Sequence, residues 1–144
     1  MKNVVITGST RGIGLCMAKK FLKAGCNVTI SGRGKSIASD LEKELAPFKN
    51  DYLYAGCDVS RMEDVEGLWQ SSNKKWGNID IWINNAGQNC PFEYCYNTDS
   101  SYVESLIDTN IKGMIFGSQT AAGNMIEKGT GQIWNMEGLG SNGR

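Results

Sequence analysis

A glycine-rich turn at residues 7–14 most constrains how this chain can fold. An apolar run, Val4–Ile6, precedes the turn, and apolar residues at helical spacing follow it at Ile13, Met17 and Phe21. This order predicts a strand, a tight turn and a helix whose first free N–H groups point above the turn. The dipole of that helix adds about half a positive charge there. The pattern therefore favours an anion site, such as one for a pyrophosphate, over a merely flexible loop. The residues expected to form it are Gly8, Ser9, Thr10, Arg11, Gly12, Ile13 and Gly14.

Strand-like and helix-like segments alternate along the whole chain, which predicts a parallel α/β sheet with helices on both faces. Strands are expected at about 4–6, 27–31, 52–56, 79–83 and 132–136, and helices at about 12–24, 37–45, 62–76 and 99–126. Ser60 and Glu63 are predicted to form a capping box before the third helix. Gly113 and Gly117, one turn apart in the long helix, predict a close approach of another backbone. No repeat or change in composition marks a second domain, so residues 1–144 are expected to form one domain.

Composition excludes several classes of function. The formal net charge is zero and 40% of the residues are hydrophobic, which argues against a nucleic-acid surface and against disorder. There is no long apolar segment and no pattern of a signal peptide at the start, so neither a membrane span nor secretion is expected. The five cysteines form no Cys-x-x-Cys pair and the chain has no histidine, which disfavours a zinc site and any catalysis that needs histidine. Scattered thiols of this kind predict a cytoplasmic protein.

Polar residues are expected where the strands of a parallel sheet end, because ligands bind there. The second strand is followed by Arg33, in place of the acidic residue that would bind a ribose 2′-hydroxyl. A guanidinium there can hold a 2′-phosphate, and Arg11 adds a second positive charge. We therefore expect NADP(H) to be preferred over NAD(H), the alternative being two surface arginines without a partner. Asp58 could accept from an adenine amino group and Val59 could pack on the ring, although Asp58 could equally be a turn residue.

Two further segments carry amides. Asn85, Ala86 and Gly87 follow the fourth strand, where small residues would let a ribose approach. Asn110 falls on or next to the apolar stripe of the long helix, and a buried amide needs hydrogen-bond partners. Asn110 is either a structural residue bonded to a backbone carbonyl or an amide that holds a water for proton transfer.

Taken together, these motifs and their order resemble the classical short-chain dehydrogenase/reductase family. The resemblance implies a Rossmann-type, doubly wound sheet in three α/β/α layers. It also implies a nicotinamide cofactor and hydride transfer to or from a small-molecule carbonyl or alcohol. By the same resemblance, residues 7–14 match the pyrophosphate turn, Asp58 and Val59 the adenine site, residues 85–87 the ribose wall, and Asn110 the catalytic asparagine.

The sequence also departs from the family pattern. The acid–base pair of the family, Tyr-x-x-x-Lys on the helix after the fifth strand, is absent from these 144 residues. Gly138 stands where the family usually has a serine, and Ser141 is a candidate substitute that could donate to a carbonyl. Residues 135–141 resemble the corresponding segment of chlorophyll(ide) b reductases, a short match from which no substrate is inferred.

We therefore expect an NADP(H)-dependent reductase represented by its amino-terminal, cofactor-binding part, either a truncated product or an incomplete sequence. Such a chain is expected to be weak or inactive as an enzyme. The alternative is a non-catalytic module that binds NADP(H) or a partner protein. In either case the long helix and the open edge of the fifth strand predict self-association into a homo-oligomer, or else marginal stability.

Overall fold

Each apolar run of the sequence forms a strand of one parallel sheet in the computed structural model, which describes residues 1–89 and 94–138. The strands lie in the order β3-β2-β1-β4-β5, and all four neighbouring pairs are parallel. They are β1 (Asn3–Ile6), β2 (Asn27–Gly32), β3 (Tyr52–Gly56), β4 (Ile81–Asn84) and β5 (Gln132–Asn135). This is the predicted doubly wound sheet, and the expected strands differ from the observed ones by no more than two residues at either end.

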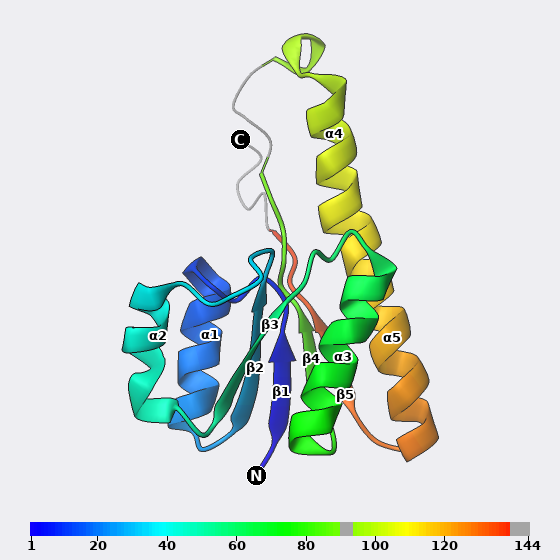
Figure 1. Cartoon of the computed structure of the whole chain (residues 1–144). Coiled ribbons are helices and arrows are strands. Elements are labelled where there is room, and N and C mark those ends of the chain that lie inside the picture. Colours follow the sequence, from blue (N-terminus) through cyan, green and yellow to red (C-terminus); the bar gives the residue numbers. More distant parts are fainter. Residues whose placement is uncertain (90–93, 139–144) are drawn as a thin grey trace.

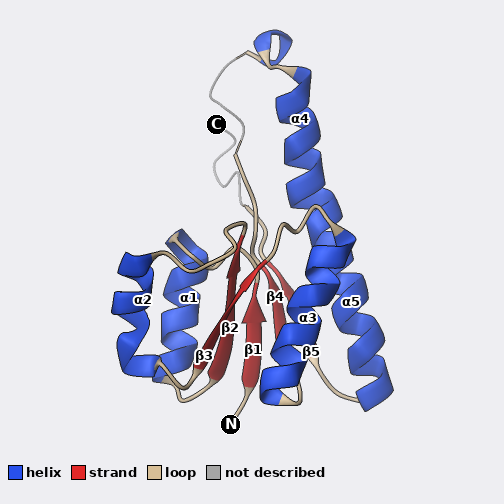
Figure 2. Cartoon of the chain, in the orientation of Figure 1, coloured by secondary structure: helices blue, strands red, loops and turns tan. Residues whose placement is uncertain are grey.

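Helices cover both faces of the sheet, as Figures 1 and 2 show. The α-helices are α1 (Gly12–Lys23), α2 (Ser39–Leu45), α3 (Met62–Trp76), α4 (Ser100–Ile107) and α5 (Gly113–Lys128). Short 3₁₀ turns occupy Ala46–Phe48 and Cys95–Asn97. The predicted long helix is present, but a π-helical turn, Asp108–Lys112, divides it into α4 and α5. No helix in the described part of the chain is long and apolar enough to cross a membrane.

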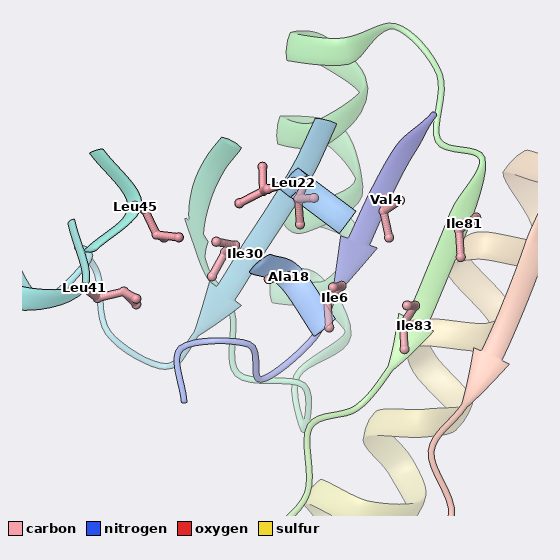
Figure 3. Close-up of a cluster of buried hydrophobic side chains, with 10 residues drawn as sticks. Val4, Ile6, Ala18, Leu22, Ile30, Leu41, Leu45, Ile81 and Ile83 are labelled. Atoms are coloured by element: carbon pink, nitrogen blue, oxygen red, sulfur yellow. The ribbon is translucent and has the colours of Figure 1, made fainter. Parts of the chain in front are cut away.

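Two hydrophobic cores form because alternate residues of the buried strands face opposite sides of the sheet. On one side, strand residues such as Val4 and Ile30 pack against Ala18 and Leu22 of α1 and Leu45 of α2 (Figure 3). On the other side, the core under α3 and α5 consists of Val5, Cys57, Val59, Val65, Leu68, Trp69, Ile79, Trp82, Ala121 and Met125.

Helix α5 approaches the sheet closely at the two predicted glycines. A Cβ on Gly113 would lie 2.9 Å from the Cβ of Val59, and one on Gly117 would overlap the side chains of Asn84 and Trp82. The helix therefore comes close to its neighbours at both glycines, as predicted, but it meets mainly the side chains of Val59, Asn84 and Trp82 rather than another backbone.

The capping box predicted for Ser60 and Glu63 is wrong. The Ser60 hydroxyl donates instead to Asp58 Oδ1 at 2.7 Å, and Glu63 pairs with Arg61 at 2.6 Å. Arg61 is the residue at the N-cap of α3, without a side-chain cap. The Asp58 carboxylate and the Arg61 guanidinium thus bind the two side chains that the predicted capping box would have used.

Strand β1 lies at the point where the chain changes direction across the sheet. From β1 the chain moves to β2 and β3 on one side, and it returns to β4 and β5 on the other. A crevice therefore opens at the carboxyl ends of β1 and β4, the place where doubly wound sheets bind ligands.

Candidate functional site

A cavity of about 670 Å³ occupies this crevice. Its walls come from the glycine turn after β1 and from the residues that follow β2, β3 and β4, with one residue from the π-helical turn. Of the predicted site residues it is lined by Gly8, Thr10, Arg11, Gly12, Ile13, Gly14, Arg33, Asp58, Val59, Asn85, Ala86 and Gly87. The expectation that these segments meet at one edge of the sheet is therefore confirmed.

The glycine turn has the backbone that the sequence predicts. Gly8 and Gly12 have φ angles of 61° and 57°, a region that glycine adopts at little cost. A Cβ on Gly8 would lie 2.7 Å from the Cα of Ala86, so the turn and the segment after β4 pack together. Helix α1 begins with no side-chain cap and with no acidic residue in its first turn, so its N-terminus is free to attract an anion.

Thr7 and Asn85 join the two walls of the cavity. The Thr7 hydroxyl oxygen accepts from the backbone N–H groups of Asn85 at 2.9 Å and Ala86 at 3.0 Å. In return, the Asn85 amide donates to the carbonyl oxygens of Thr7 at 2.9 Å and Gly8 at 3.1 Å. Asn85 thus acts through its amide as a structural tie, while its backbone lines the cavity.

Ser9 is an exception among the residues predicted to bind the pyrophosphate. Its side chain is fully buried and does not line the cavity in the described structure. The hydroxyl donates to the Ile6 carbonyl at 2.6 Å and accepts from Ser31 N–H at 3.0 Å. Ser9 therefore holds the start of the turn against β2, because the turn directs its side chain into the interior.

The charges around the cavity are unevenly distributed. Arg11 and Arg33 are both exposed, and neither forms an ion pair within residues 1–89 and 94–138. Asp58 is half-buried, and one of its oxygens accepts from the backbone and hydroxyl of Ser60. Asp58 therefore forms the turn of the alternative interpretation, while its expected contact with adenine stays a prediction, and its second oxygen has no protein donor among the described residues.

Cys57 also lines the cavity, although it is not among the residues predicted to form the site. It is buried at the carboxyl end of β3. Burial raises the pKa of its thiol to about 12, and the carboxylates of Asp64 and Asp58 add to the rise. Cys57 is therefore an uncharged wall residue at neutral pH, and no nucleophile.

Asn110 is exposed in the described chain, so the expectation that it is buried is wrong. Its amide binds the backbone of Gln88 twice, accepting from the N–H and donating to the carbonyl, both at 2.9 Å. The Gln88 side chain donates to Ser105 Oγ at 3.0 Å. Asn110 thus fastens the segment after β4 to the long helix, and the catalytic role that the resemblance implies stays a prediction.

Sequence reasoning missed several residues that line the cavity, and one residue that it predicted lies outside the described part of the chain. Gly32, Gln88, Asn89 and Thr109 also line the cavity. Their only signal was position, since each lies within two residues of one already predicted. Ser141 lies outside the described residues. No group of three or more side chains able to hold a metal ion occurs among the residues described.

The family model of the short chain dehydrogenases matches residues 2–142, which is almost the whole chain. The chain belongs to the short-chain dehydrogenase family. The glycine turn, the open start of α1 and the segment after β4 are thus features of a short-chain dehydrogenase fold, as the resemblance implied.

Curated relatives of this short-chain dehydrogenase include a chlorophyll(ide) b reductase. The chloroplastic NOL enzyme of Oryza sativa is 40% identical over 149 residues, which cover 99% of this chain and 43% of that protein. The NADP-dependent 3-hydroxy acid dehydrogenase YdfG of Escherichia coli K12 is 34% identical, over 92% of this chain and 52% of its own length. The chain thus spans about half the length of the curated relatives that it matches.

Solved structures agree on the fold. A serine dehydrogenase complexed with NADP⁺ superposes with a TM-score of 0.81 at 30% identity, over 92% of this chain and 52% of that one. A short-chain dehydrogenase/reductase from Mycobacterium marinum superposes with a TM-score of 0.84 at 28% identity, over 93% of this chain and 54% of that one.

Proposed function

We propose that this chain binds NADP(H) in the cavity at the carboxyl ends of its strands. It would supply the cofactor-binding part of an oxidoreductase that transfers hydride to or from a small-molecule carbonyl or alcohol. The observation that carries the proposal is the uncapped start of α1 in a cavity that Arg11 and Arg33 also line. Neither arginine forms an ion pair with another described residue.

The residues present fit a phosphate-rich dinucleotide. The cavity volume of about 670 Å³ is in the range of ligand sites. The diphosphate would lie over Gly12 and Ile13, where helical N–H groups are free, and a 2′-phosphate would lie near Arg33 and Arg11. The serine dehydrogenase that superposes on this chain was solved with NADP⁺, and YdfG is NADP-dependent, which supports the same preference here.

When bound, the cofactor supplies the hydride, and the residues of this chain bind and orient it. Asn85 and Asn110 hold the segment 85–89 as the wall next to which a ribose would lie. These 144 residues contain no Tyr-x-x-x-Lys pair. A positioned general acid contributes about 10²–10⁴-fold to the rate, so we expect the chain alone to bind cofactor with little turnover.

Titration with NADPH and NADH tests this proposal. The 144-residue chain should bind NADPH more tightly than NADH, as measured by fluorescence of the reduced nicotinamide or by calorimetry. Arg33→Ala should weaken NADPH binding roughly tenfold or more, since a charge-assisted hydrogen bond to phosphate is lost, and should leave NADH within about twofold. Lys23→Ala, at the far end of α1, is the control. Tighter binding of NADH by the unaltered chain would contradict the proposal.

The second candidate function is a non-catalytic module that binds NADP(H) or a partner protein. An assay of simple aldehydes and ketones distinguishes the two, because slow but measurable oxidation of NADPH by the chain would support the enzyme, whereas a module predicts cofactor binding with no oxidation at all.

Self-association is part of the proposal. Several apolar side chains of the long helix are exposed, and β5 pairs only with β4 in the described sheet. We propose that a second copy covers the long helix. We also propose a reducing compartment such as the cytoplasm, in keeping with the free thiols of Cys16, Cys26 and Cys57.

A further inference from the structure

Arg33 lies on a short loop, Gly32–Lys35, that needs an external support. Glycines stand on both sides of Arg33, and glycine gives a backbone more conformational freedom than any other residue. Arg33 is exposed and lines both the cavity described above and a second one of about 710 Å³ beside β3. A flexible loop would spread the guanidinium over many positions, so whatever fixes the loop also fixes the charge.

The support comes from the neighbouring edge strand. The hydroxyl of Tyr54, in the middle of β3, donates to the carbonyl oxygen of Gly34 at 2.7 Å and lies 3.4 Å from that of Gly32. The ring of Tyr54 packs against the core under α1 and α2, so the hydroxyl is held in place. Burial raises the pKa of Tyr54, and the hydroxyl therefore stays protonated as a donor at neutral pH.

The loop also fits tightly between two other segments. A Cβ on Gly56 would lie 2.8 Å from the Gly34 carbonyl oxygen, so the loop rests directly on the end of β3. A Cβ on Gly32 would lie 2.8 Å from Cγ2 of Thr10, so its other end rests on the glycine turn. The backbone at Arg33 is thereby held between the turn and β3.

We propose that Tyr54 is a positioning residue that determines cofactor specificity, because its hydroxyl holds the Gly32–Lys35 loop and so places Arg33 to bind a 2′-phosphate. This inference rests on the proposed function. Tyr54 itself does not touch the first cavity in the described structure. Its effect should therefore fall on cofactors that carry the 2′-phosphate and spare those that lack it.

The test compares dissociation constants of NADPH and NADH for the 144-residue chain and its variants. Tyr54→Phe removes one hydroxyl and keeps the packed ring. It should weaken NADPH binding roughly three- to tenfold, the usual range for one hydrogen bond, and leave NADH within about twofold. In an Arg33→Ala background, Tyr54→Phe should cause no further loss of NADPH affinity, because the charge that it positions is absent.

Tyr52→Phe is the matched control. Tyr52 lies two residues earlier on the same face of β3, and its hydroxyl has no hydrogen-bond partner among the described residues. This variant should bind both cofactors as the unaltered chain does. The inference is overturned if Tyr54→Phe leaves cofactor binding unchanged, as Tyr52→Phe should, or if it weakens the binding of both cofactors equally. It is also overturned if Tyr54→Phe causes the same loss of NADPH affinity in the Arg33→Ala background as in the unaltered chain. Loss on Arg33→Ala without any response to Tyr54→Phe overturns this inference alone, whereas an unaltered chain that binds neither cofactor overturns the proposed function as well.

Discussion

Three asparagines hold the site together, each through hydrogen bonds of its uncharged side-chain amide. Asn85 joins β4 to the glycine turn, and Asn110 joins the segment after β4 to the long helix. Asn84 is buried, accepts from the indole of Trp82 at 2.7 Å, and donates to Asn135 of β5 at 2.8 Å. Each amide therefore sets the distance between two segments that the sequence keeps far apart.

Sequence alone placed most lining residues correctly, because the carboxyl ends of parallel strands share one edge. It could not orient side chains within that edge. Ser9 and Asn110 show the difference, since a serine in a turn and an asparagine on a helix can face either way until a neighbour provides a partner. For Ser9 that neighbour is β2, and for Asn110 it is the backbone of Gln88.

Cys57 gives a prediction about pH and reactivity. Its folded-state pKa of about 12 lies above the ordinary value of 9.0, so the folded state favours the protonated thiol. The resulting contribution to stability is complete below pH 9 and is lost as the pH rises from 9 toward 12. At pH 8, iodoacetamide should modify Cys57 at least about a hundredfold more slowly than the exposed Cys16, because the thiolate reacts.

Peptide mass spectrometry over a time course measures both rates in one sample. Labelling in urea is the control, and there the two rates should become similar. Equal modification of Cys16 and Cys57 in the native protein would contradict the buried position of Cys57.

At the scale of elements, the strands were the most predictable part, because each is a short apolar run between polar turns. The boundary at Ile79 was misplaced, since that residue is buried in the loop before β4. The π-helical turn was not predictable, as nothing in residues 108–112 distinguishes it from an α-helix. The capping box failed because Asp58, on the preceding loop, competes for Ser60.

The packing of α5 gives a matched pair of substitutions. Gly117→Ala would place a Cβ 2.8 Å from Nε1 of Trp82, so it should destabilise the protein by about 1–3 kcal/mol. Gly123→Ala, on the same helix, meets no atom within 4 Å and should stabilise it by about 0.5–1 kcal/mol through helix propensity. Urea unfolding followed by circular dichroism measures both. The same sign for the two variants would contradict the close contact at Gly117.

At the scale of the whole molecule, the helix formed by α4 and α5 carries an exposed apolar stripe. Its members are between 37% and 51% exposed in the described chain, and they are Val103, Ile107, Ile111, Met114 and Ile115. The sequence predicted the stripe from its spacing, and the expected self-association through the long helix already implied that the stripe is exposed; in the described chain α4 extends past the carboxyl ends of the strands (Figure 1).

The proposed oligomer gives a prediction at this scale. Ile107→Lys should shift the mass measured by light scattering toward that of a monomer at the same concentration, because a charge would be buried between copies. Glu42→Lys, on α2 at the opposite face of the sheet, should leave the mass unchanged. An unaltered chain that is monomeric at high concentration would contradict the proposed interface.

The order in which the cavity residues occur along the chain has a consequence for synthesis. Every described residue that lines the first cavity precedes Asn110, and the two walls are joined by Thr7 and Asn85. Synthesis therefore adds every described lining residue before it adds α5 and β5, which support the cavity only through contacts such as that of Asn84 with Asn135.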